Sequence, residues 1–222
     1  MKSLVECINE SNNIELVSDG KEHGFDYVDL GLPSGTMWAT CNVGATKPED
    51  EGLLFQFGRV DGYKYGDKNN KFRTNAQNKQ DIGSEYIPLT SSGKTYDVGE
   101  TLDLEDDVAH VHMGGAWRMP TKDQLEELYY NTTNEVVTIN GLQGMLFTSN
   151  INNRQLFVPF VGYWYDGNYY FARSCVVMWS SQVLDSYING AYRLYCDSDG
   201  ESDVNNYSLR SIANSVRGVF NK

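Results

Sequence analysis

The C-terminal third of the chain carries the residue types best suited to binding a ligand. Its polar segments 163–170, 182–190 and 197–214 are rich in Tyr, Asn, Asp, Ser and Gly. Tyrosine offers a large contact area with few rotatable bonds, and Ser, Asn and Gly add adaptable hydrogen bonding. Exposed rings also stack on sugars or on apolar patches of a protein. These segments therefore predict a ligand-binding surface, although turns with tyrosines packed at their bases would have the same composition.

The candidate ligand-binding residues share an aromatic, amide or charged side chain within these segments. They are Trp164, Tyr165, Asn168, Tyr170, Asp185, Tyr187, Asn189, Asp199, Asn205, Asn206, Tyr207, Arg210 and Asn214.

Catalytic and metal-binding patterns are weaker. His110 and His112 would share a metal only on a strand, and the surrounding sequence favours a helix, on which they diverge. The acids of segment 197–203 could serve a glycosidase or bind Ca²⁺, but Gly200 comes too early for an EF-hand loop. No zinc-protease, paired CxxC, nucleophile-elbow or P-loop motif is present. We therefore expect no enzyme, no cofactor and no metal.

Composition excludes further classes. The 18 basic and 30 acidic residues give a net charge of −12, which disfavours binding to phosphate backbones. The longest apolar run, 175–179, is too short to cross a membrane. Glu6 and Glu10 interrupt the apolar stretch that a signal peptide needs, so we expect folding in a cytoplasm. There the four cysteines, 7, 41, 175 and 196, are expected to act as small buried hydrophobes.

The first half of the chain predicts a hairpin and a long loop. Apolar alternation on both sides of the Gly- and Pro-containing turn at 31–35 predicts a β-hairpin over 25–44. Thr46 and the Pro and acids after it predict a helix start. Residues 61–100 have no lasting period and are expected to form a loop-rich excursion. Residues 1–23 are expected to be a leader that is either disordered or docks on a larger assembly, with a single ligand-binding domain over 24–222.

The centre predicts two helices and the rest predicts strands. Residues 103–113 have helical spacing, and Thr121 with Gln124 forms a capping box that begins a second helix. Asn140-Gly141 predicts a type I′ hairpin between strands at 136–139 and 143–147. Further strands are expected at 156–161, 176–181, 191–196 and 215–220, with loops between them.

Four segments resemble one known family. They are 27–45 (YVDLGLPSGTMWATCNVGA), 117–121 (WRMPT) with the helix that follows, 179–181 (WSS) and 215–219 (SVRGV). Together they resemble the "major paralogous" domains of gut Bacteroidales and their phages, which have a C-type-lectin-like fold. The resemblance implies an α+β fold, with two helices flanking a small twisted antiparallel sheet and long irregular loops that present the ligand surface.

The resemblance also implies a function. A leader without a signal peptide fits a protein of the phage virion, an adhesin that recognises a bacterial surface glycan or protein and that could repeat in a homo-oligomer. Phage proteins of this fold include variable proteins of diversity-generating retroelements, and 173–179 with 215–219 resemble the borders of a diversified region. The alternatives are a structural virion decoration without a ligand, and a relative of formylglycine-generating oxidases that would use Cys175 or Cys196.

Overall fold

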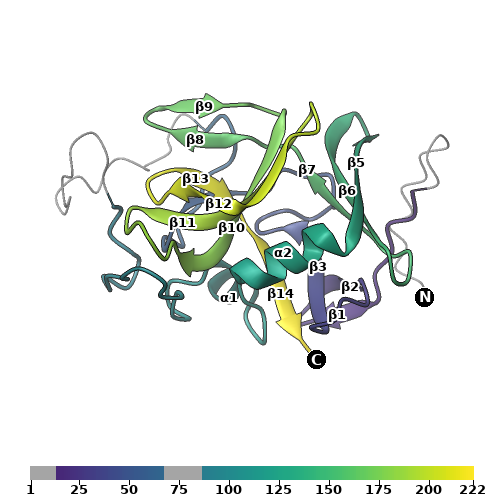
Figure 1. Ribbon diagram of the computed structural model, residues 1–222, viewed down its shortest axis with the longest axis horizontal. Helices are drawn as coiled ribbons and strands as arrows, with labels where there is room; N and C mark the ends of the chain where they lie inside the picture. Colours follow the sequence, from purple (N-terminus) through teal and green to yellow (C-terminus); the bar gives the residue numbers. More distant parts are fainter. Residues whose placement is uncertain (1–13, 68–86) are drawn as a thin grey trace.

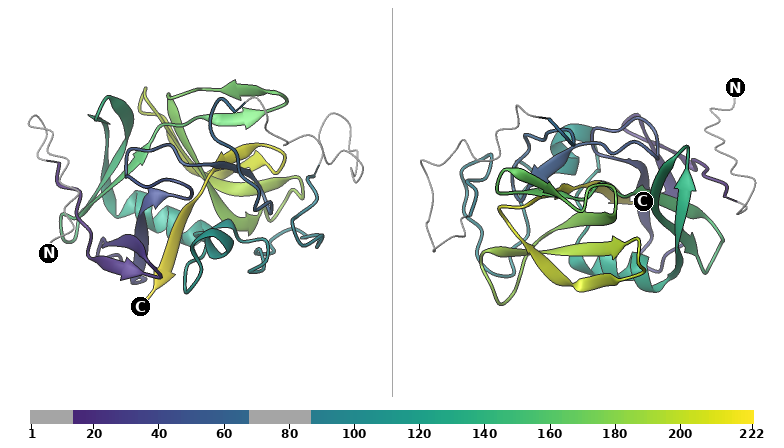
Figure 2. Two further views of the ribbon diagram at one scale, coloured as in Figure 1. Left: turned by 180° about the vertical axis from the view of Figure 1, so that it is seen from behind. Right: turned by 90° about the horizontal axis from the view of Figure 1, so that it is seen from above.

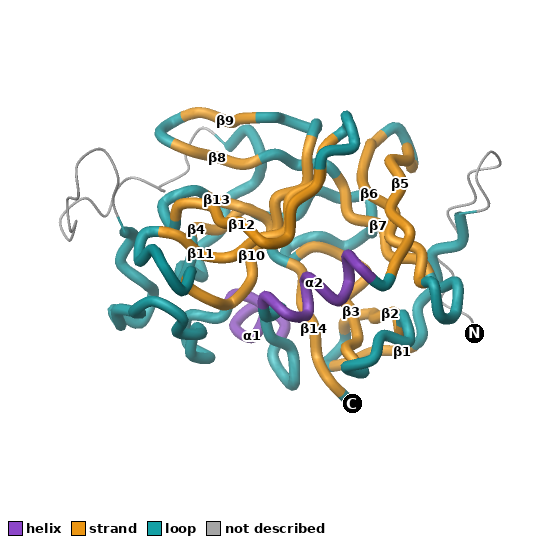
Figure 3. Tube along the Cα trace, viewed as in Figure 1, coloured by secondary structure: helices purple, strands orange, loops and turns teal. Residues whose placement is uncertain are grey.

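The computed structural model describes residues 14–67 and 87–222 (Figure 1). Strands make up 43% of it and helices 8%, in two helices, and Figure 3 shows how short these helices are beside the strands. The expected α+β arrangement of two helices flanking one small sheet is therefore wrong. The described residues fold into three sheets, one of which curls into a half-barrel, and their helices are too short to form a layer.

The first sheet joins the two ends of the described chain. It contains β1 (Gly20–Glu22), β2 (Phe25–Asp29), β3 (Thr36–Asn42) and β14 (Arg217–Asn221), in that order and all antiparallel. The predicted hairpin over 25–44 is confirmed as β2–β3. Figure 2 shows the last strand lying beside this early hairpin.

The second sheet is a three-stranded meander of β5 (Thr132–Ile139), β6 (Leu142–Ser149) and β7 (Gln155–Pro159). Asn140 and Gly141 connect the first two strands with φ values of 50° and 82°. These positive φ values are those of a type I′ turn, so the predicted hairpin is confirmed.

Within residues 14–67 and 87–222, two helices precede β5 in the sequence. α1 (Val108–Met113) is capped by the Asp107 side chain, and α2 (Lys122–Tyr130) begins with the predicted capping box of Thr121 and Gln124. α2 buries Leu125 and Leu128, which pack with strands of all three sheets in one apolar cluster. The helix predicted from residue 103 begins later, because 103–107 form turns, and the segment after Thr46 forms turns instead of a helix.

The third sheet has the order β12-β11-β10-β13-β8-β9, and β4 also pairs with β13. Its strands are β4 (Leu54–Gln56), β8 (Tyr163–Tyr165), β9 (Asn168–Tyr170), β10 (Cys175–Val183), β11 (Gly190–Asp197), β12 (Ser202–Leu209) and β13 (Ala213–Ser215). Segments expected as loops form β8, β9, β12 and β13. The Tyr residues of β8, β9 and β12 favour a strand. β9 pairs with the adjacent β8 and β12 with the adjacent β11, whereas β13 pairs with strands distant in sequence.

The N-terminal boundary also needs correction. Ile14 and Leu16 are buried against Val137, Ile139 and other side chains of the three-stranded sheet, and β1 lies within the expected leader. Residues 14–23 therefore belong to the folded domain. The docking role expected for the leader can apply only to 1–13, which lie outside the described residues, as does 68–86 of the expected excursion at 61–100.

Neither described helix has the length and apolar composition that crossing a membrane requires.

Candidate ligand-binding surface

One side of β11 carries a charged and an aromatic side chain. Strand pairing places Arg193 beside Trp179 and Tyr195 beside Val177. Because successive side chains of a strand alternate between faces, Arg193 and Tyr195 point away from Leu194, which packs with α2 in the core. Arg193 and Tyr195 are each half-buried. β11 thus presents a guanidinium and a phenol on the same face.

The β8–β9 hairpin lies close to these two side chains. The backbone N–H groups of Val161 and Gly162 both donate to the carbonyl of Cys175, at 3.0 and 2.9 Å, which fixes the start of β8 beside the start of β10. Burial raises the pKa of the next residue, Tyr163, and the neighbouring Cys175 thiol adds to this rise while the Arg193 charge opposes it. Tyr163 and Arg193 therefore lie within electrostatic reach of each other.

The tyrosines of this hairpin form an ordered array. Tyr163 pairs with Tyr170 across the strands, and their rings stack with centroids 5.6 Å apart and 16° between planes. Tyr165 lies 6.4 Å from Tyr170, and Phe171 lies 6.0 Å from Tyr163. We call Tyr163, Tyr165, Tyr170, Arg193 and Tyr195 the tyrosine face.

The opposite side of the hairpin anchors it. Trp164 and Tyr169 pair across the strands and pack with Ala213 and other apolar side chains beneath. The Tyr169 hydroxyl donates to the carbonyl of Lys64 at 2.9 Å, and its ring meets Tyr65 edge-on at 4.7 Å. The tyrosine face therefore stands on a packed base, which limits the entropy that it would lose on binding.

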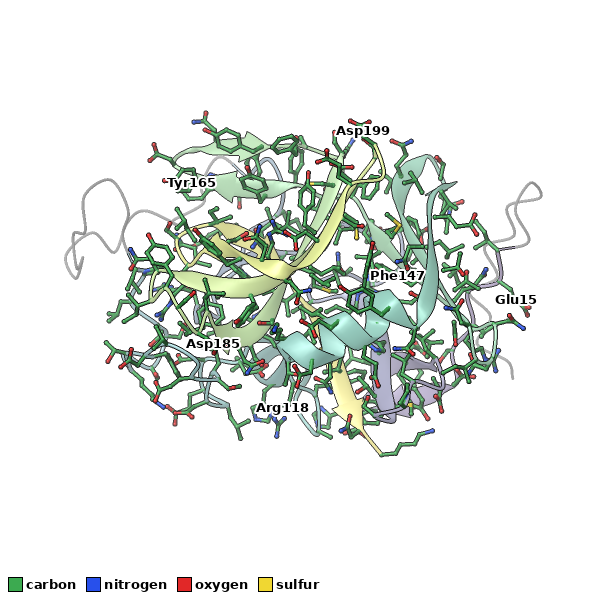
Figure 4. All side chains as sticks on the ribbon, in the orientation of Figure 1. Glu15, Arg118, Phe147, Tyr165, Asp185 and Asp199 are labelled. Carbon is green, nitrogen blue, oxygen red and sulfur yellow. The ribbon has the colours of Figure 1, made fainter. Side chains whose placement is uncertain are left out.

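A turn built around Asp197 borders this face. One carboxylate oxygen of Asp197 accepts from the backbone N–H groups of Asp199 and Glu201, at 3.0 and 2.9 Å, and the other accepts from the Tyr195 hydroxyl at 3.0 Å. Asp197, one of the acids considered above as an alternative catalytic or calcium ligand, thus shapes a turn. Asp199 itself is exposed at the tip (Figure 4).

The predicted site residues do not form one surface. In Figure 4, Tyr165 and Asp199 lie in the upper half of the molecule and Asp185 lies far below them. Asp185 accepts from the Tyr192 hydroxyl at 2.8 Å, and the rings of Tyr187 and Tyr207 meet edge-on at 5.6 Å. Asp185, Tyr187 and Tyr207 therefore form a second patch.

Four predicted site residues are buried in this structure. Trp164 is 2% exposed, Asn189 2%, Arg210 1% and Asn214 0%. Arg210 donates to the carbonyls of Tyr96 and Ile188, and so it joins loops of the framework. The structure places these four side chains inside the framework, because a polar residue type does not reveal the direction of its side chain in a sheet.

The remaining predicted residues are accessible. Asn168, Tyr170, Asn205, Asn206 and Tyr207 are exposed, and Asn205 donates to the Tyr130 hydroxyl at 3.4 Å. The sequence interpretation missed Tyr163, Arg193 and Tyr195. Period-two alternation in 191–196, with Leu194 and Cys196 turned to the core, would have placed Arg193 and Tyr195 on the outer face.

The residues of the catalytic alternatives are engaged or buried. Nε2 of His112 lies 2.8 Å from the Val60 carbonyl, and Nδ1 of His110 lies 2.7 Å from Arg118. Within residues 14–67 and 87–222, no group of three His, Cys, Asp or Glu side chains is arranged to hold a metal ion. Burial raises the pKa of both Cys175 and Cys196 to about 12, which suppresses the nucleophilic thiolate.

In comparisons of the chain with family models, curated proteins and solved structures, nothing matches.

Proposed function

We propose that the protein is a non-catalytic binding protein that recognises a bacterial surface glycan through the tyrosine face. The stacked and tilted array of Tyr163, Tyr165 and Tyr170 carries this proposal. Tyrosine rings present flat apolar faces to sugar C–H groups, while their hydroxyls bond to sugar hydroxyls. The rigid base beneath them favours binding without reorganisation.

The sequence resemblance supports a location on the phage particle, where such a protein would act as a host adhesin. Weak individual sites gain strength when many copies bind one cell. The purified protein should therefore bind weakly to cells when it is free in solution. It should bind strongly when many copies are displayed on one bead or particle.

The test compares two matched double variants. Y165A/Y170A removes rings from the tyrosine face, and Y187A/Y207A removes rings from the second patch. We expect the first pair to lower binding to cultured Bacteroidales cells at least tenfold in flow cytometry, and the second pair to leave it unchanged. Melting temperatures of both variants should stay close to that of the parent, because the replaced rings are exposed or half-buried.

Each contrary result has a definite meaning. Unchanged binding by Y165A/Y170A would refute the tyrosine face as the site. Loss confined to Y187A/Y207A would move the site to the second patch. Loss of binding after protease treatment of the cells would identify a protein ligand. Binding of the protein to polysaccharide purified from the cells would support a glycan ligand.

A further inference from the structure

The charged side chain of Arg193 uses few of its hydrogen-bond donors within the protein. Its Nη1 donates to the backbone carbonyl of Asp203 at 3.3 Å, and its guanidinium carbon lies 4.9 Å from the centre of the Tyr195 ring. Within the described part of the chain, no carboxylate lies at ion-pair distance from it. A guanidinium has five N–H donors, so most of them are available on the tyrosine face.

The nearby acids are already engaged elsewhere. Asp203 accepts from the backbone N–H of Asn205 at 2.9 Å, and Asp197 holds its own turn and the Tyr195 hydroxyl. Burial lowers the pKa of Arg193, and the field of Asp203 opposes that change. Arg193 nevertheless remains charged at neutral pH, because the pKa of a guanidinium starts far above 7. Partial desolvation strengthens any ion pair that it forms.

We infer that Arg193 binds a carboxylate of the ligand, and that the ligand is an acidic glycan containing uronic or sialic acid. The inference rests on the proposed function, since it assigns chemistry to the same face. A planar guanidinium can hold a carboxylate through two parallel N–H···O bonds. The neighbouring Tyr163 and Tyr195 supply rings for the sugar that carries the carboxylate. The net charge of −12 opposes long polyanions, so a sugar with one carboxylate in each repeat fits better than a nucleic acid.

The experiment uses pairs of probes that differ only in charge. Oligogalacturonate is compared with its carboxyl-reduced form, and sialyllactose with lactose, by calorimetry on the full chain. We expect at least tenfold tighter binding of an acidic probe than of its neutral counterpart. R193Q should remove this preference, and R193K should restore part of it, because lysine keeps the charge and loses the two-pronged geometry. R154Q is the matched control, since Arg154 is half-buried like Arg193 and pairs with Asp19 at 2.6 Å.

The outcomes separate the two proposals. Equal binding of acidic and neutral probes, with loss in Y165A/Y170A, would overturn the carboxylate inference and leave the glycan-binding function standing. Unchanged preference in a folded R193Q variant would also overturn it. Tighter, Arg193-dependent binding of an Asp/Glu hexapeptide than of every sugar would assign the site to a protein ligand. Absence of binding to all probes would count against both proposals.

Discussion

Arg217 on the last strand donates through Nε to Oδ1 of Asn42 on β3 at 3.0 Å. The same guanidinium reaches the carbonyls of Ala39 and Phe157, both at 3.1 Å. Arg217 is 0% exposed, and burial lowers its pKa to about 10. One buried cation therefore links β14 with β3 and with β7, and ties two sheets together through hydrogen bonds alone.

Removing this cation should destabilise the fold strongly. R217A leaves three buried acceptors without a donor and opens a cavity, so we expect the free energy of unfolding to fall by about 3–5 kcal/mol. Urea titration followed by tryptophan fluorescence measures the change. R154Q, which breaks only a surface ion pair, should cost less than about 1 kcal/mol. Equal effects of the two variants would show that the buried bonds contribute little.

Local signals predicted local structure well. The Asn140-Gly141 turn and the Thr121 capping box are formed by neighbouring residues, so their sequence suffices. The fold class was wrong because the seven-stranded sheet is assembled around β13, which pairs with β4, β8 and β10, all distant from it in sequence. The exposure of individual candidate residues was predicted only in part, since that of Asn214 follows from strand register, which composition does not encode. For Arg193 the period-two alternation of 191–196 carried this information.

The N-terminal segment offers a second stability test. Ile14 is 3% exposed within its apolar cluster, whereas Ile151 is 56% exposed. Truncation of the buried isoleucine forfeits apolar burial and leaves a cavity, so I14A should cost about 2–4 kcal/mol. I151A should change stability by about 0.5 kcal/mol or less. If thermal unfolding shows the two variants to be alike, residue 14 belongs to a loosely attached leader after all.

The buried thiols predict low reactivity. With a pKa of about 12, fewer than about one in 10³ of the Cys175 and Cys196 thiols is ionised at pH 8. Iodoacetamide labelling of the native protein, read by peptide mass spectrometry, should modify both at least 100-fold more slowly than in urea. Half-buried Cys41 should react faster than either. Rapid native labelling of Cys175 would revive the oxidase alternative.

The raised pKa values of the same thiols predict that the fold loses stability at high pH. Their pKa is about 9 in the unfolded chain and about 12 in the fold, so the folded state resists losing these protons. Their contribution to stability is complete below pH 9 and is lost as the pH rises toward 12. Urea midpoints should therefore fall between pH 8 and pH 10.5. The fall should be smaller in C175A/C196A, and an equal fall would assign the effect to the buried tyrosines.

Two adjacent residues of β8, Trp164 and Tyr165, are expected to have different roles, one in the framework and one on the binding surface. Trp164 is 2% exposed and packs beneath the hairpin, whereas Tyr165 is half-buried on the tyrosine face. W164A should lower the free energy of unfolding by about 3–5 kcal/mol through the cavity that it creates. Y165A should cost less than about 1 kcal/mol and should weaken cell binding instead. Differential scanning fluorimetry and flow cytometry on both variants measure the two effects.

The control is W164F. Because W164F keeps an aromatic ring in the base, it should recover both stability and binding. If W164F folds like the parent but loses binding as completely as W164A, Trp164 is itself a ligand contact and the division between framework and surface at this hairpin is wrong.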